Sequence, residues 1–319
     1  MRSFAISALS LLCIGTILGN ADAIQAQANP KLADAIDSIR PSVVKVVVKL
    51  VRSPANPFPQ VPEAFKGCFN DTSVCIVGTG FFVNSNGDVV TAFHVVDGFR
   101  AKSGAYIRGT RQVIEALEAA GVHAGIGIGV ATPNFEKGGI TVLSNTQLYS
   151  AELVATDPSH DLALIRPTAN PFRGMPQLIG GQALADMPRP TVKDVTFSLS
   201  RPRDGEDVFA CGYPFSEPGL ITTSGILASA WNSEVLLRAE AAGFPSPQNV
   251  YTVDLRINPG DSGGPVFRMF DQAVIGVAVE TRGGLALVVP AKLVTDFLTS
   301  QHVSWTPAKT ASGESFKPK

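Results

Sequence analysis

Short apolar runs separated by glycine, proline and asparagine dominate this chain and predict a protein built from β-strands. Residues 78–83 and 89–92 are apolar runs joined by an Asn/Gly turn, which is typical of a strand, a tight turn and a second strand. Val43 to Leu50 is a similar run near the start of the chain. Five later segments have the same character, namely 207–211, 220–229, 249–254, 273–280 and 285–289.

Helical spacing is rarer, so helices are expected only as short additions to the strands. Residues 32–39 form one such segment, and a second begins at Pro290 and runs to about residue 300. A third, 111–120, lies in what reads as an insertion at 100–143. We interpret the insertion as a surface flap, an assembly element or a decorated loop.

The composition is that of a globular protein with many turns. Hydrophobic residues make up 45% and charged residues 17% of the 319 residues, and there are 30 glycines and 23 prolines. The formal net charge is −1, so the chain lacks the basic surface that nucleic acids and anionic membranes attract. We therefore expect no nucleic-acid partner.

Residues 1–23 predict a secretory signal peptide. Arg2 precedes an apolar run from Phe4 to Leu18, and Ala-Asp-Ala at 21–23 offers a cleavage site, with a second at 26–28. The alternative is a transmembrane anchor, for which the run is short. We expect an exported protein, periplasmic or secreted, with no stable membrane anchor.

If the protein is exported, we expect its four cysteines to differ in their chemical state. Cys68 and Cys75 flank a turn-rich loop, and an oxidising compartment would favour a disulfide between them, with two unpaired thiols as the alternative. Cys13 leaves with the signal peptide, and Cys211 lies in an apolar run that predicts a small buried side chain. The cysteines are too few, and lack suitably spaced histidines, for a structural zinc. We expect no metal and no cofactor.

One serine has a setting that suits a nucleophile. Ser262 lies in the segment 258–265, Asn-Pro-Gly-Asp-Ser-Gly-Gly-Pro. A serine nucleophile needs donors for the negative charge that develops on the attacked carbonyl. Gly260 can adopt backbone angles that turn its N–H, with that of Ser262, toward one point. The alternative is an ordinary glycine-rich turn between two strands.

A serine hydrolase also needs a base and a carboxylate, and the chain has only four histidines. His94 lies where the predicted strand 89–92 ends, and its pairing with Ser262 makes it the candidate base. Asp161 begins an apolar run, where an imidazole N–H would compensate for its burial. Asp157 is the alternative carboxylate, but it precedes a proline and suits a turn better.

The order His94, Asp161, Ser262, with the motifs Thr-Ala-x-His, Asp-Leu-Ala-Leu and Gly-Asp-Ser-Gly-Gly-Pro, resembles trypsin-like serine endopeptidases of the chymotrypsin fold. Within them the chain is most similar to the Deg/HtrA proteases, over about residues 36–302. The resemblance implies catalytic roles for these three residues and an oxyanion hole made by the backbone N–H groups of Gly260 and Ser262.

The resemblance also implies the fold, which is all-β, with two antiparallel six-stranded Greek-key barrels and a short C-terminal helix. The stretch 174–190, rich in glycine and proline, would cross between the barrels. The expected limits are a protease domain at 24–302, barrel one at about 40–170, barrel two at about 190–290, a helix at 291–301 and a disordered tail at 303–319.

Three features depart from the Deg/HtrA pattern. We expect no PDZ domain after His302, because too few residues follow it. Asp261 stands where that pattern has asparagine, and no Arg followed by Ile-Val-Gly-Gly is present to supply the new N-terminus that pairs with this aspartate in trypsin. The N-terminal aromatics that form trimers are missing, so the oligomeric state stays open.

Cleavage specificity depends on the position six residues before the serine, which sets the floor of the substrate pocket in trypsin-like proteases. That residue is Arg256, and Val277 and Val279 fall on the adjacent wall. An arginine in the pocket would favour acidic side chains. Alternatively Arg256 points out of the barrel, or a carboxylate such as Glu280 neutralises it, which leaves an apolar pocket. We prefer the second interpretation, because an unpaired buried guanidinium is costly.

The sequence thus predicts a serine endopeptidase that cleaves polypeptides through an acyl-enzyme intermediate, in extracytoplasmic protein processing or quality control. One alternative is an esterase-like hydrolase with the same triad. The other is a catalytically silent binding or chaperone protein on the same fold.

Overall fold

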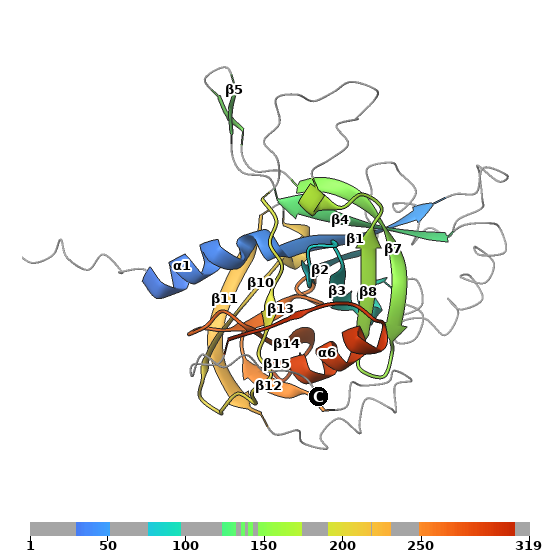
Figure 1. Ribbon diagram of the computed structural model, residues 1–319. Helices are drawn as coiled ribbons and strands as arrows, with labels where there is room; N and C mark the ends of the chain where they lie inside the picture. Colours follow the sequence, from blue (N-terminus) through green and yellow to red (C-terminus); the bar gives the residue numbers. More distant parts are fainter. Residues whose placement is uncertain are drawn as a thin grey trace, which may run out of the picture.

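The computed structural model describes residues 30–51, 76–96, 123–131, 135–137, 140–142, 146–173, 191–217, 219–230 and 249–309. Within these ranges strands dominate, and they form two β-barrels packed against each other (Figure 1). Several predictions fall outside the described residues, namely the signal peptide at 1–23, the Cys68–Cys75 disulfide, the helix at 111–120 and the crossing at 174–190.

The first barrel closes through six antiparallel strands in the order β1-β2-β3-β8-β7-β4. Their apolar residues point inward, and all four residues of β3 are buried, because this strand also contacts β14 of the second barrel. The strands are β1 (Val43–Val51), β2 (Ile76–Phe82), β3 (Val89–Ala92), β4 (His123–Ala131), β7 (Thr146–Asp157) and β8 (Leu162–Pro167).

The second barrel closes in the order β13-β10-β11-β12-β15-β14, with β14 pairing back to β13. These strands too are antiparallel, so the prediction of an all-β fold with two six-stranded antiparallel barrels is confirmed. The strands are β10 (Asp207–Gly212), β11 (Ile221–Ser229), β12 (Tyr251–Asp254), β13 (Pro265–Arg268), β14 (Val274–Arg282) and β15 (Leu285–Pro290).

Short elements decorate the barrels. Helix α6 (Ala291–Ser300) packs on β14 and β15 through Val294, Phe297 and Leu298, close to its predicted bounds. The small hairpin β5–β6 projects away from the barrels in Figure 1. The other elements are α1 (Pro30–Ile39), η1 (Arg40–Ser42), α3 (Phe93–Val96), β5 (Phe135–Lys137), β6 (Ile140–Val142), η3 (Pro171–Arg173), β9 (Thr196–Phe197), η4 (Pro214–Ser216) and β16 (Thr306–Pro307).

Part of the predicted insertion at 100–143 is a barrel strand. β4 pairs with β1 on one side and with β7 on the other, so it belongs to the body of the first barrel. Its sequence alternates glycine with isoleucine and valine, and glycine usually indicates a loop. Here the missing side chain makes room, because a Cβ on Gly127 would lie 3.1 Å from the Tyr149 carbonyl oxygen and 3.3 Å from Leu148 Cδ1.

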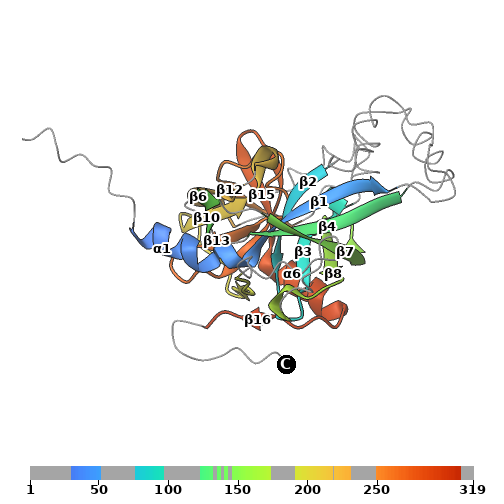
Figure 2. The ribbon, with the colours of Figure 1, turned by 90° about the horizontal axis from the view of Figure 1, so that it is seen from above.

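The prediction of a disordered tail at 303–319 is wrong for residues 303–309. Asn84 Nδ2 donates to the Ser304 carbonyl at 2.9 Å, and the Trp305 ring meets Phe197 edge-on at 6.1 Å between centroids. β16, which is labelled in Figure 2, then pairs in parallel with β9. The polar composition concealed this ordering, because the contacts come from residues more than a hundred positions away.

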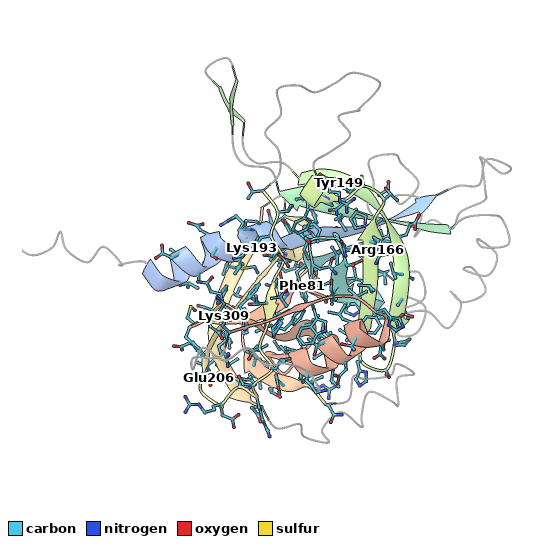
Figure 3. All side chains as sticks on the ribbon, in the orientation of Figure 1. Phe81, Tyr149, Arg166, Lys193, Glu206 and Lys309 are labelled. Carbon is cyan, nitrogen blue, oxygen red and sulfur yellow. The ribbon has the colours of Figure 1, made fainter. Side chains whose placement is uncertain are left out.

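One apolar cluster spans both barrels, and another lies within the second barrel. Phe81 of β2, labelled near the middle of the molecule in Figure 3, lies 6.2 Å from the Phe197 ring. From the second barrel, the rings of Phe209 and Phe267 stack at 5.2 Å and are fully buried in the same cluster. Shared burial therefore holds the barrels together.

We expect Phe209→Ala to lower the free energy of unfolding by about 3–5 kcal/mol, because it removes a buried ring and leaves a cavity. The matched control is Phe270→Ala, whose ring is 69% exposed and lies under Arg268. That variant should cost less than about 1 kcal/mol. Urea denaturation measures both. Equal losses in the two variants would contradict the shared core.

Candidate active site

His94 and Asp161 contact each other where β3 ends beside the start of β8. His94 lies in the short helix α3, directly after β3, and Asp161 lies in the turn before β8. The His94 ring Nδ1 is 2.7 Å from Asp161 Oδ2, and the His94 backbone N–H donates to Asp161 Oδ1 at 2.8 Å. The Phe93 N–H donates to the Asp161 carbonyl at 3.0 Å. Asp161 thus holds both the backbone and the ring of its partner.

The turn at Asp161 requires an unusual backbone conformation. Its φ is 54°, in the left-handed region that aspartate and asparagine tolerate better than most residues. The Asp161 side chain is 13% exposed, and that of His94 is 36% exposed. The sequence prediction that this carboxylate would be compensated by an imidazole agrees with the observed geometry.

The pKa of His94 is raised above its usual value. Burial acts to lower it, but the hydrogen bond to Asp161, with the negative charges of Asp161 and Glu280, outweighs burial and favours the protonated ring. Glu280 belongs to β14, so the second barrel contributes to the electrostatics of a histidine on the first.

The alternative carboxylate, Asp157, has partners of its own. Its Oδ2 lies 2.6 Å from His160 Nδ1, and its Oδ1 accepts from the Ser159 hydroxyl at 2.5 Å. Ser159 Oγ lies 3.3 Å from the same His160 Nδ1. The carboxylate and the serine thus share one ring nitrogen, which is not the arrangement of a nucleophile and its base.

The loop before β13 presents the backbone of Gly260 and Ser262. The N–H groups of Asp261, Gly263 and Gly264 donate to Asn258, Ala278 and Asp261 carbonyls at 2.7–2.9 Å. Among the described residues, neither the Gly260 nor the Ser262 N–H has a hydrogen-bond partner. These two donors are therefore available to an oxyanion.

Two glycines allow this loop to form. Gly260 has φ of 107°, and a Cβ there would lie 2.4 Å from the Tyr213 carbonyl oxygen. Gly263 has φ of 84°, and its Cβ would lie 2.3 Å from Thr91 Oγ1 and 2.5 Å from the Ala92 nitrogen. No other residue fits these positions without moving the backbone.

The close contact of Gly263 with Ala92 places the neighbouring Ser262 beside the end of β3, which lies two residues before His94. Ser262 is half-buried, and its carbonyl accepts from the Thr79 N–H of β2 at 2.9 Å. In the described part of the chain, Ser262 Oγ makes no hydrogen bond to the His94 ring. The distance between a nucleophile and its base is often longer than a hydrogen bond when no substrate is bound.

Thr79 contacts the Ser262 loop through its hydroxyl, which the sequence patterns did not predict. Its side chain is fully buried, its Oγ1 donates to the Gly260 carbonyl at 2.7 Å, and the same atom accepts from the Tyr213 N–H at 3.0 Å. The only sequence signal was its place between two glycines in a predicted strand. Local sequence does not reveal a partner 181 positions away.

Asp261 has a backbone donor as its partner. Its Oδ2 accepts from the Asn258 N–H at 2.9 Å, and its Oδ1 packs against Gly212, where a Cβ would lie 2.3 Å away. Burial raises the pKa of Asp261 to about 6, and the Asn258 bond opposes that rise. Burial thus makes this carboxyl group a weaker acid than an ordinary aspartate.

The predicted pocket residues divide between surface and core. Arg256 is exposed, whereas Val277 is fully buried and Val279 is 4% exposed, and both valines belong to the shared apolar cluster. Glu280 instead pairs with Arg282 at 3.4 Å. The Arg256 side chain is in contact with solvent, so it is not an unpaired buried charge.

Cys211 matches its prediction as a small buried residue. It is 1% exposed, its sulfur lies 3.2 Å from Thr222 Oγ1, and burial raises the pKa of its thiol to about 12. A thiol held neutral in this way is a poor nucleophile. Within the described ranges, no group of three or more His, Cys, Asp or Glu side chains could hold a metal ion.

The comparison with known families agrees with this geometry. A model of the trypsin-like peptidase domain matches residues 78–277, which include most of β2, the His94–Asp161 pair and the Ser262 loop. This chain belongs to the trypsin-like peptidase domain family.

Several relatives are Deg/HtrA proteases, as the sequence predicted. Serine protease HTRA1B of Danio rerio is 26% identical over 288 residues, covering 89% of this chain and 44% of its own length. Serine protease HTRA3 of Homo sapiens is 26% identical over 271 residues, covering 84% and 44%. A probable periplasmic serine endoprotease DegP-like of Rickettsia conorii is 27% identical over 222 residues, covering 67% and 32%.

The chain spans less than half the length of these relatives. A crystal structure of Deg5 aligns with a TM-score of 0.49 and 18% identity, over 86% of this chain and 97% of that one. None of the helices in the described residues is long and apolar enough to span a bilayer.

We expect the pKa of His94 to lie above about 6.5, the value for a free histidine, because its carboxylate neighbours favour the protonated ring. An NMR titration, assigned with His94→Gln, measures it. Glu280→Gln should lower the midpoint by removing one negative charge, whereas Glu152→Gln on β7 should leave it unchanged. A midpoint at or below 6.5 in the unmodified protein would contradict the observed pairing.

Proposed function

We propose that this protein is a serine endopeptidase in which Ser262 attacks the peptide carbonyl, His94 is the base and Asp161 orients the imidazole. The observation that carries the proposal is the joining of three parts. A His–Asp pair on the first barrel lies next to a glycine-bounded serine on the second, and the backbone N–H groups of Gly260 and Ser262 have no partner among the described residues.

The hydrogen-bond pattern supports these roles. Because the Asp161 carboxylate can only accept, Nδ1 of a neutral His94 carries the proton, and Nε2 has the free lone pair that a base needs. Ser262 Oγ would lose its proton to Nε2 as it bonds the carbonyl carbon. The resulting oxyanion would be stabilised by the Gly260 and Ser262 N–H groups.

The second half of the cycle uses the same groups. The protonated His94 would give its proton to the leaving amine, so that the peptide bond breaks and an acyl-enzyme on Ser262 remains. Water, deprotonated by His94, would then hydrolyse the ester and restore the serine. No step requires a cofactor.

The substrates and cell location follow from the relatives and the sequence. We propose polypeptide substrates, and a mature domain that begins at residue 24, includes the packed segment 303–309 and acts in extracytoplasmic protein processing or quality control. The DegP-like relatives are named as periplasmic, which supports an exported location. The predicted Cys68–Cys75 disulfide would belong to the same oxidising environment.

Ser262→Ala should abolish measurable proteolysis and labelling by a fluorophosphonate. Asp161→Asn should lower kcat by about 10⁴-fold, because the imidazole would adopt the wrong tautomer. Hydrolysis of unfolded casein and mass mapping of the labelled peptide measure both effects.

The matched control is Ser159→Ala, which removes the hydroxyl of the second Ser, His and Asp cluster. We expect it to keep full activity. More than a tenth of the activity remaining in Ser262→Ala would refute the assignment. Turnover of esters without turnover of proteins would favour an esterase, and absence of labelling in the unmodified protein would favour a silent binding protein.

Specificity should follow from the position of Arg256. Because the Arg256 side chain is exposed and does not place a buried positive charge in the barrel, we propose cleavage after small aliphatic residues such as Val, Ala and Ile. A cleavage profile on a mixed peptide library should show this preference, with little change in Arg256→Ala. Predominant cleavage after Asp or Glu, lost in that variant, would overturn it.

A further inference from the structure

The Thr79 hydroxyl is fully committed to two backbone groups of the second barrel. Its hydrogen points to the Gly260 carbonyl at 2.7 Å, and its lone pair accepts the Tyr213 N–H at 3.0 Å. Its own backbone N–H donates to the Ser262 carbonyl. One residue of the first barrel thus holds the loop at both ends of the Gly260–Ser262 stretch.

These contacts act on the peptide planes that carry the two free donors. A trans peptide directs its carbonyl and its N–H in opposite directions. The Pro259 carbonyl accepts from the Phe215 N–H at 2.7 Å, and this bond aims the Gly260 N–H. The Asp261 carbonyl accepts from the Gly264 N–H at 2.9 Å, and this bond aims the Ser262 N–H.

Thr79 restrains the segments that make the Phe215–Pro259 and Gly264–Asp261 hydrogen bonds. Its hydroxyl ties the segment Tyr213–Phe215 to Gly260, which keeps the Phe215 N–H over the Pro259 carbonyl. It also fixes the Gly260 carbonyl and, through its backbone, the Ser262 carbonyl. The plane with the Ser262 N–H therefore lies between two planes that Thr79 restrains.

We propose that Thr79 is a positioning residue of the oxyanion hole, whose hydroxyl keeps the Gly260 and Ser262 N–H groups convergent. The proposal rests on the function proposed above. It explains why a buried hydroxyl occurs within an apolar strand of the first barrel, with both its donor and its acceptor used by the second. The Thr79 hydroxyl makes no hydrogen bond to the carboxylate of Asp161 or to the ring of His94 among the described residues.

The test compares Thr79→Val, which has the same shape without the hydroxyl, with Thr79→Ser, which keeps it. For hydrolysis of a peptide substrate, Thr79→Val should lower kcat by about 10- to 100-fold, less than the roughly 10²- to 10³-fold for losing an oxyanion donor. KM should change less than about threefold, and Thr79→Ser should stay within about threefold of the parent.

A peptide aldehyde reports on the hole directly, because its adduct with Ser262 places an oxygen there. In Thr79→Val its Ki should rise by about the factor by which kcat/KM falls. The acid limb of the pH profile should not move, because the His94–Asp161 contact is intact. Thr295→Val, which removes another buried hydroxyl on α6, is the control and should leave both constants unchanged.

Full kcat in Thr79→Val, or a loss that Thr79→Ser shares, would overturn the proposal. So would unchanged aldehyde affinity beside a lower kcat. If Thr79→Val does not fold, Thr79→Ala gives the same comparison, and loss of folding in both would show a purely structural role. Failure of the proposed function is distinct, because then the unmodified protein would neither hydrolyse the substrate nor bind the aldehyde.

Discussion

The docking of the Ser262 loop onto β2 is the constraint on which the geometry of the site depends. The Thr79 N–H of the first barrel donates to the Ser262 carbonyl of the second at 2.9 Å. Gly263 lies so close to Thr91 and Ala92 that no side chain would fit at its position. A serine on one barrel and a histidine on the other can work together only while this contact holds. The position of Ser262 is therefore a property of the barrel interface rather than of its own loop.

Apolar burial makes that interface rigid enough to hold hydrogen-bond geometry. The cluster that includes Phe81, Phe197 and Phe209 runs through both barrels, so separation of the barrels would expose large rings. The polar contacts lie at its edge, where Thr79 and Thr91 are also fully buried. Buried hydroxyls require partners, so the packing and the hydrogen bonds specify one relative placement of the barrels.

Sequence patterns predicted what local chemistry determines. Apolar runs gave most barrel strands, and the chemistry of a desolvated carboxylate favoured Asp161 over Asp157 as the partner of His94, as the geometry has it. Sequence patterns failed to predict segments whose structure depends on contacts with residues far away in the sequence. Glycines in β4 concealed a strand that needs bare backbone beside β7, and the polar segment after His302 is ordered by Asn84 and Phe197. Thr79 escaped notice because both partners of its hydroxyl lie on the other barrel.

A crystal structure of the protein after reaction with a peptide boronic acid tests the account most directly. It predicts a bond from boron to Ser262 Oγ, and one boronate oxygen about 2.7–3.1 Å from both the Gly260 and Ser262 nitrogens. The His94 ring should remain paired with Asp161, with Nε2 directed at the adduct. Boron attached to another residue, or an oxygen directed away from these two N–H groups, would contradict it.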